Sequence, residues 1–99
     1  MRIIARTALV DFWSRHTEAE ARLQAWYRAL KHCSARNYNE LLQTFSTADY
    51  VPKKFTVFDV GGNAYRVVTV IHYNTQTAYI RGVFTHAEYD RWTRENRLS

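Results

Sequence analysis

Cysteine and proline are nearly absent from this 99-residue sequence, which has one of each, Cys33 and Pro52. A single cysteine excludes an internal disulfide and a cysteine-rich metal cluster, and it is typical of a reducing compartment. No hydrophobic run is long enough to span a bilayer, and segment 1–6 is too short and too charged for a signal peptide. We therefore expect a cytoplasmic protein without a membrane segment.

The motifs of several common sites are missing as well. His16, His32 and His72 lack the spacing of metal ligands, so we expect no metal and no cofactor. The segment 61–63, Gly-Gly-Asn, lacks the spacing of a dinucleotide-binding or Walker loop and indicates a hairpin turn instead. No serine or cysteine lies in a nucleophile-elbow pattern, and the aromatic strands lack the RNP pattern of an RNA-recognition module.

Positive charge, by contrast, is abundant. Fourteen Lys and Arg against nine Asp and Glu give a formal net charge of +5, and eleven of the fourteen are arginine. The 46% hydrophobic content is enough to bury a modest core in one domain spanning residues 1–99. Arginine and tyrosine suit contacts with phosphates and stacking on bases, although an acidic protein would be attracted to the same charge. Both kinds of partner stay open on charge alone.

The segment 61–73 is expected to organise the fold. Gly61 and Gly62 adopt positive φ without steric cost, so they predict a tight reversal before the β-branched run that follows. Side chains alternate across that central strand, which places Arg66 on a mostly apolar face beside Val68 and Val70. A guanidinium there needs an anionic partner or a route to solvent. Two interpretations remain open: pairing with an acid or snorkelling at an edge, and contact with a phosphate.

Helix and strand patterns occupy the rest of the chain. The expected elements are a strand at 2–5, a short helix from Thr7, a helix after a capping box at 17–20 that runs to about His32, one helical turn at 40–45, an irregular segment at 46–52, strands at 55–60, 64–73 and 77–84, and a helix from a second capping box at 85–88 through about Arg94. An apolar stripe at helical spacing predicts that the second helix packs on the core: Ala19, Leu23, Trp26, Leu30 and Cys33. Helices segregated from an antiparallel meander indicate an α+β fold. We expect an antiparallel sheet, made of the N-terminal strand and a three-strand meander, packed against two N-terminal helices, with a short C-terminal helix.

Side chains that could carry chemistry gather late in the chain. His86 is the expected first residue of the last helix and Tyr89 lies three residues on, so both project from one side of a helix N-terminus that favours anions. Together with arginines they suit metal-free RNA cleavage, in which the 2′-OH attacks the adjacent phosphorus. The alternative is that His86 is an ordinary helix residue and Tyr89 packs on the sheet.

Four segments, in order over nearly the whole chain, resemble one family. They are RIIAR with FW shortly after it, AWYRALK, STADYVPKKFTVFDVGGNAYRVV and YIRGVFTHAEYD. The sequence is similar to the HigB group of RelE-like toxins from bacterial toxin–antitoxin systems. The resemblance implies a RelE-like fold, a small mRNA endonuclease that cuts messages on the translating ribosome, and inhibition by a cognate HigA-type antitoxin that carries a helix-turn-helix domain.

The resemblance also implies roles for particular residues. Arg66 matches the arginine of the family's YR strand, which faces the scissile phosphate, and Lys53 and Lys54 fall near basic residues at the start of the preceding strand. His86 and Tyr89 match the THxEYD segment near the family's C-terminal catalytic side chains, although RelE itself is arginine-rich there and has no histidine. We expect His86 as base or acid, Tyr89 as a proton-transfer or stacking partner, and Arg66 with Lys54 as charge stabilisers. The expected RNA contacts are Lys53, Arg81, Arg91 and Arg94.

Two further expectations follow. Arg81 lies on the opposite strand face from His86 if the pleat is regular through Thr85, so we expect it to contact an RNA backbone, including that of ribosomal RNA. A non-catalytic basic module that binds RNA or an acidic protein is the alternative to an enzyme, and a pure interaction protein is a second alternative.

Overall fold

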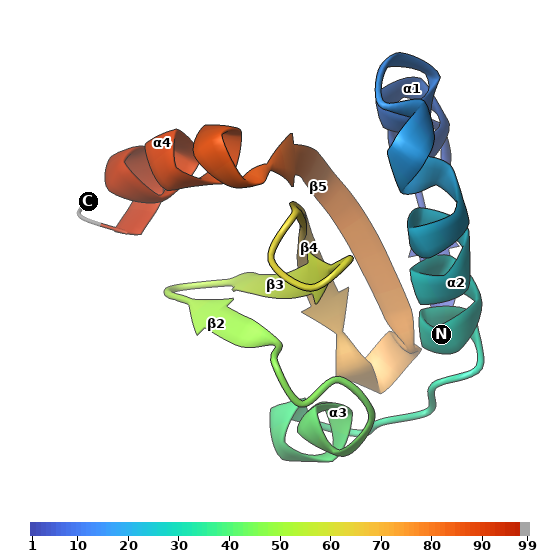
Figure 1. Ribbon diagram of the computed structural model, residues 1–99. Coiled ribbons are helices and arrows are strands. Elements are labelled where there is room, and N and C mark those ends of the chain that lie inside the picture. The colour runs from blue at the N-terminus through green and yellow to red at the C-terminus, as the bar shows by residue number, and fades with distance from the viewer. Residues whose placement is uncertain (98–99) are drawn as a thin grey trace.

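The computed structural model describes residues 1–97, which form a five-stranded sheet and four α-helices (Figure 1). The elements are β1 (Arg2–Ile4), α1 (Thr7–Arg15), the 3-10 turn η1 (Thr17–Ala19), α2 (Glu20–Lys31), α3 (Tyr38–Thr44), β2 (Asp49–Val51), β3 (Phe55–Val60), β4 (Tyr65–His72), the 3-10 turn η2 (Tyr73–Thr75), β5 (Thr77–Thr85) and α4 (His86–Arg97). The expected α+β class is confirmed. None of the described helices combines the length and the apolar character that a membrane span requires.

The sheet has the strand order β1-β5-β4-β3-β2, which makes β4 the central strand, as expected. Strands β2 to β5 pair antiparallel with their neighbours, whereas β1 pairs in parallel with β5. The prediction of an antiparallel sheet is therefore wrong for its first strand, and the sheet is mixed. Parallel neighbours need a long crossover connection, and residues 5–76 lie between β1 and β5.

A second difference lies at the opposite edge of the sheet. The segment expected to be irregular contains β2, whose last residue, Val51, pairs with Phe55 of β3. Pro52 follows that last pair and lies in the turn, where its missing N–H removes no ladder hydrogen bond. The proline signal was correct about the turn but did not exclude a short edge strand before it.

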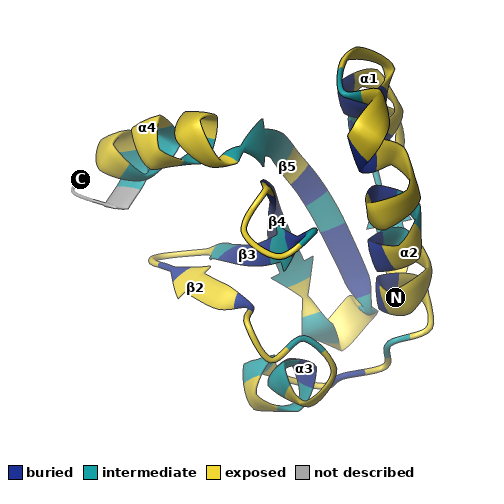
Figure 2. Ribbon diagram, viewed as in Figure 1, coloured by how far each residue is buried: buried dark blue, intermediate teal, exposed yellow. Residues whose placement is uncertain are grey.

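One face of the sheet is covered by the N-terminal helices. The expected stripe on α2 is buried: Leu23 and Leu30 are fully covered, and the Trp26 ring packs edge-on against Phe58 of β3 at 5.2 Å. Figure 2 shows α1 and α2 buried on the side that faces the sheet and exposed on the outer side. Residues of β4 on the face opposite to Arg66, such as Val67, and the residues of β5 beside that face, such as Ala78, belong to this main core.

The other face of the sheet carries a smaller apolar cluster and the C-terminal helix. Its buried members are Val51, Val57 and Val68, and they pack against partly buried side chains of β3, β5 and α4, namely Phe55, Phe84, Tyr89 and Trp92. Gly82 allows this packing, since a Cβ there would lie 2.6 Å from the Phe84 ring. Helix α4 extends to Arg97, so it is longer than the short helix through Arg94 that the sequence predicted.

Of the two expected capping boxes, the one at Thr85 is present and the one at Thr17 is not. At α4 the Thr85 hydroxyl accepts from the Glu88 N–H at 3.3 Å, and the Glu88 carboxylate accepts from the Thr85 N–H at 2.9 Å. The box at Thr17 is wrong, because residues 17–19 wind as a 3-10 turn without a side-chain cap bond. Thr7 also makes no cap and is itself the first residue of α1.

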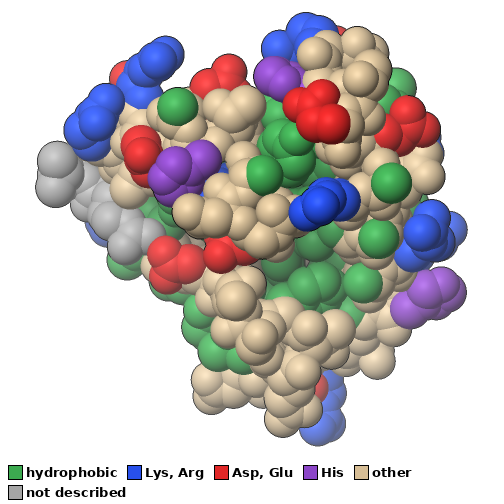
Figure 3. All heavy atoms as spheres, in the orientation of Figure 1, with side chains coloured by type: hydrophobic (Ala, Val, Ile, Leu, Met, Phe, Trp, Pro, Cys, Tyr) green, Lys and Arg blue, Asp and Glu red, His purple; other side chains and the backbone are tan. Residues whose placement is uncertain are grey.

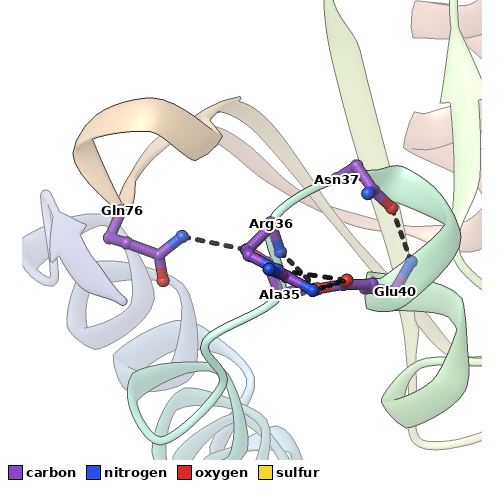
Figure 4. Close-up of polar contacts among 5 residues, drawn as sticks. All are labelled: Ala35, Arg36, Asn37, Glu40 and Gln76. Carbon is purple, nitrogen blue, oxygen red and sulfur yellow. Dashed lines mark hydrogen bonds and ion pairs between the residues drawn. The ribbon is translucent and has the colours of Figure 1, made fainter.

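The connection from α2 to the sheet is held by side-chain amides and one ion pair (Figure 4). The Asn37 side chain accepts from the Glu40 N–H at 2.9 Å, so α3 begins at Tyr38, two residues before the expected helical segment. Glu40 also accepts from Arg36, through its backbone N–H at 2.8 Å and its guanidinium at 3.0 Å. Gln76, in the left-handed region at φ 52°, donates to the Ala35 carbonyl at 2.9 Å. This loop is therefore tied to the turn before β5.

Candidate active site

The centre of the candidate site is Arg66, near the start of the central strand. Its side chain is only 9% exposed, and Asp59 lies directly opposite it on β3. Arg66 Nε is 3.0 Å from Asp59 Oδ1, and a terminal nitrogen donates to the Tyr65 carbonyl at 3.1 Å. Of the two open interpretations, pairing with an acid is therefore confirmed for this state, and a buried guanidinium requires such a partner.

The hairpin before β4 supplies another contact to Arg66. Gly61 and Gly62 take φ values of 68° and 66°, as the sequence predicted for this turn. The reversal returns Asn63 toward the strand, where its side-chain oxygen accepts from an Arg66 terminal nitrogen. The turn therefore both sets the strand register and holds the guanidinium.

His86 reaches the site from the first residue of α4. The backbone N–H of His86 donates to the Ala64 carbonyl at 3.1 Å, which attaches the start of the helix to the start of β4. Ring Nδ1 lies 3.5 Å from a terminal nitrogen of Arg66, and ring Nε2 lies 3.6 Å from Asp90. Because arginine has only donors, Nδ1 is the acceptor in the contact with Arg66. The side chain is about half exposed, so a ligand could reach it.

Tyr89 also contacts the guanidinium of Arg66. The Arg66 Cζ atom is 5.6 Å from the centre of the Tyr89 ring, which is within cation–π distance. Tyr89 stacks on Trp92 at 5.7 Å, and Trp92 meets Phe55 of β3 edge-on at 5.1 Å. A row of three rings thus runs beneath α4 away from Arg66. The sequence-based expectation that His86 and Tyr89 share one side of the helix agrees with their common contact to Arg66.

The three residues combine functions that phosphoryl chemistry needs. Arg66 carries a permanent charge, His86 can accept or donate a proton, and Tyr89 provides a ring and a hydroxyl. In the present state the guanidinium is engaged by protein groups. A phosphate would therefore have to replace its contacts with Asn63 and His86, which lie on the more exposed side of the site.

Lys53 and Lys54 lie elsewhere. They occupy the turn between β2 and β3, at the opposite end of β3 from Asp59. Phe55 and Asp59 are four residue steps apart on β3, which is about 13 Å along the strand. Both lysines line a cavity of about 440 Å³ together with Pro52, Phe55 and Asn96. The structure therefore groups Lys54 with Lys53 and with the C-terminal half of α4, and apart from Arg66.

Arg81 lies at an irregularity of the sheet. Val68 pairs with Gly82 and Thr69 pairs with Ile80, so Arg81 is an extra residue in β5. Its guanidinium lies over the Tyr79 ring at 5.5 Å, and Tyr79 in turn packs on His72, which shares the face of Arg66. The expectation of a regular pleat is wrong, and the bulge directs Arg81 to the face that Arg66 occupies.

Arg91 and Arg94 are exposed on α4. Arg91 lines a cavity of about 240 Å³ beside Glu88 and Glu95, so acidic side chains accompany it. In the view of Figure 3, Lys and Arg side chains are scattered over the face, and acidic side chains lie between several of them. On that face the net positive charge does not form one continuous patch.

Several site residues were missed by reasoning from the sequence alone. Asp59 and Asn63 contact Arg66, Asp90 contacts His86, and Trp92 extends the row of rings. A usable signal existed for Asp59, because it is the charged position on an otherwise apolar face of its strand, and a four-residue hairpin loop places it opposite Arg66. Within residues 1–97 no group of three or more His, Cys, Asp or Glu side chains is arranged to hold a metal ion.

The fold and the site together define a class of protein: a small α+β domain with an arginine on the central strand and a histidine at the start of the last helix. A family model described as "HigB_toxin, RelE-like toxic component of a toxin-antitoxin system" matches residues 19–92. The chain belongs to this HigB toxin family, and the family expected from the sequence is confirmed.

Individual relatives cover nearly the whole chain. The mRNA interferase toxin HigB of Escherichia coli strain K12 is 33% identical over 100 residues, which is 98% of this chain and 95% of the relative. The mRNA interferase HigB of Shigella flexneri has the same identity and coverage. A further mRNA interferase HigB, from Escherichia coli O6:H1, is 28% identical over 98% of this chain and 96% of the relative.

Proposed function

We propose that this chain is an mRNA endonuclease, the toxin of a type II toxin–antitoxin pair, and that it inhibits translation by cutting messages. The observation that carries the proposal is the meeting of Arg66, His86 and Tyr89 at the start of α4. Membership of the HigB toxin family supports it, as do relatives that are named mRNA interferases. A purely structural role for Arg66 would not need an exposed histidine beside it.

The proposed reaction is transesterification within the RNA chain. The 2′-oxygen forms a bond to the adjacent phosphorus as the bond from phosphorus to the 5′-oxygen breaks, which leaves a 2′,3′-cyclic phosphate and a 5′-hydroxyl. His86 takes the proton from the 2′-OH or gives one to the departing 5′-oxygen, and Tyr89 is its proton-transfer or stacking partner. Arg66 stabilises the charge that develops on the phosphate oxygens.

The remaining basic residues are proposed to hold the RNA. We assign Lys54 to the phosphate of a neighbouring nucleotide, where it stabilises the negative charge of the bound RNA, because it lies over the Phe55 ring at the far end of the row of rings from Arg66. Exposed cations contact the RNA backbone or ribosomal RNA in this proposal: Lys53, Arg81, Arg91 and Arg94.

The cellular setting is part of the proposal. We propose that a single domain spanning residues 1–99 acts in the cytoplasm, that cleavage requires the translating ribosome, and that a HigA-type helix-turn-helix antitoxin inhibits it. The ribosome is invoked because the site contains few acid and base groups for an autonomous nuclease.

The test is to express the wild type and His86→Ala from a tightly controlled promoter and to map new 5′ ends of cellular mRNA. We expect growth arrest and new ends that carry a 5′-hydroxyl within translated regions, and we expect both to disappear in His86→Ala. His32→Ala is the matched control, because His32 is an exposed histidine at the C-terminal end of α2, on the helix-covered side of the sheet, and should retain full activity. If the wild type makes no new cuts, the chain is a non-catalytic basic module.

A further inference from the structure

We infer that Asp59 is a positioning residue for the proposed reaction. Its carboxylate holds the Arg66 guanidinium in the orientation that faces His86, and its charge opposes the binding of a phosphate there. This inference rests on the proposed function, because it concerns the phosphate site of that same reaction.

Asp59 contacts the guanidinium of Arg66 at one defined position. Its Oδ1 atom lies 3.0 Å from Nε, the guanidinium nitrogen nearest the backbone. One terminal nitrogen is fixed by the Tyr65 carbonyl at 3.1 Å, and the other lies between Asn63 and His86. With Nε and one terminal nitrogen held from inside the protein, the remaining terminal nitrogen can point only toward the exposed side of the site.

The register of the sheet fixes the position of Asp59 relative to Arg66. Asp59 and Arg66 are a directly opposed pair on β3 and β4, so backbone hydrogen bonds fix their separation. Without the carboxylate, a permanently charged side chain that is only 9% exposed would lose its ionic partner. Arginine is long enough to turn its head group toward water, and Arg66 would then no longer aim at His86.

The same carboxylate also acts on any bound anion. A phosphate at the outer edge of the guanidinium would lie close to a second negative charge, and like charges at such distances repel. Orientation and repulsion can be separated by substitution. Asparagine keeps an oxygen that can accept from Nε but removes the charge, whereas alanine removes both.

The experiment measures single-turnover cleavage of a defined mRNA on programmed ribosomes, and of the same mRNA alone, as a function of toxin concentration. For Asp59→Asn we expect the half-saturating concentration to fall several-fold, by up to about tenfold, with the maximal rate kept, because one partly screened repulsion is removed. For Asp59→Ala we expect the maximal rate to fall about 100-fold, because a displacement of about 1 Å at a reacting group has that effect.

A spectroscopic readout does not depend on activity. The Nε–H proton of Arg66 should give a protected NMR signal in the wild type and in Asp59→Asn, and should lose protection in Asp59→Ala. Urea unfolding of each variant shows whether it remains folded. If Asp59→Ala is too unstable to assay, the fall in half-saturating concentration and the retained signal in Asp59→Asn still decide the question.

Asp11→Asn is the matched control. Asp11 is an exposed acid of α1, on the helix-covered side of the sheet, where it pairs with Arg15 at 3.5 Å. The Asp11→Asn substitution changes the net charge by the same amount as Asp59→Asn, and it should alter neither the half-saturating concentration nor the maximal rate. An equal gain in Asp11→Asn would overturn the inference, as would equal losses of rate in Asp59→Asn and Asp59→Ala. An inactive wild type would instead refute the proposed function, and the role of Asp59 with it.

Discussion

His86 and Arg66 lie 20 residues apart in the chain, yet ring Nδ1 of the histidine is 3.5 Å from a terminal nitrogen of the arginine. The backbone produces this contact. Thr85, the last residue of β5, pairs with Tyr65, and the next N–H donates to the Ala64 carbonyl at 3.1 Å. The helix therefore starts at a point set by the sheet register, and its first side chain faces the second residue of β4.

The pairing of Arg66 with Asp59 predicts a non-additive effect on stability. Arg66→Ala leaves a partly buried carboxylate without its cation, so we expect it to lower the free energy of unfolding by about 3 kcal/mol. The double variant Arg66→Ala/Asp59→Ala should lose less than Arg66→Ala, because no lone charge remains, yet it should stay inactive. Urea denaturation and mRNA cleavage provide the two measurements. Additive losses would show that the ion pair is not coupled.

The position of Lys54 predicts an effect on binding without an effect on chemistry. We expect Lys54→Ala to weaken RNA binding and to lower the slope of log affinity against log salt by about 1, while the maximal cleavage rate stays unchanged. Lys31→Ala is the control, because Lys31 is an exposed lysine at the end of α2, outside the proposed site. A large loss of maximal rate in Lys54→Ala would place Lys54 in the catalytic step instead.

The two capping boxes predict opposite responses to the same substitution. Thr85→Ala removes an observed cap of α4 and should destabilise the protein by about 1 kcal/mol. It should also reduce cleavage, since His86 is the first residue of that helix. Thr17→Ala removes no side-chain cap and should change stability by less than about 0.5 kcal/mol. Thermal unfolding of both variants tests the pair, and equal losses would contradict it.

Tyr65 predicts how stability changes in alkali. Burial, and to a smaller degree the hydrogen bond that its hydroxyl donates to Glu18 at 3.1 Å, raise the pKa of Tyr65 above its ordinary value. Above about pH 10 the unfolded chain therefore loses this proton first, and the free energy of unfolding falls as pH rises. Tyr65→Phe should cost about 1 kcal/mol at neutral pH and should make that fall shallower. Urea denaturation between pH 8 and 11 measures both, and an unchanged slope would refute the assignment.

Reasoning from the sequence succeeded where the signal was local. The Gly61-Gly62 reversal, the buried stripe on α2 and the capping box of Thr85 each depend on a few neighbouring residues, and each is present in the structure. The strand β2 was missed because three residues at a sheet edge have little periodicity of their own. They form a strand because β3 is there to pair with them.

The candidate site shows the same division. Arg66, His86 and Tyr89 stood out because each combines a reactive group with an unusual place in the local pattern. The bulge at Arg81 was not predictable, since a register shift arises from the pairing of two strands and leaves no periodic signal in one. For the same reason the sequence could not show whether Lys54 would lie beside Arg66.

By itself, then, the sequence determined the element types, the α+β class and the family, because helix periodicity, strand alternation, turn glycines and short motifs are properties of adjacent residues. Only the tertiary structure decided that β1 runs parallel to β5, that Asp59 neutralises Arg66, and that His86 meets both at the start of α4. These relationships join segments that are distant in the chain. They are fixed by strand register and by the need of a buried charge for a partner.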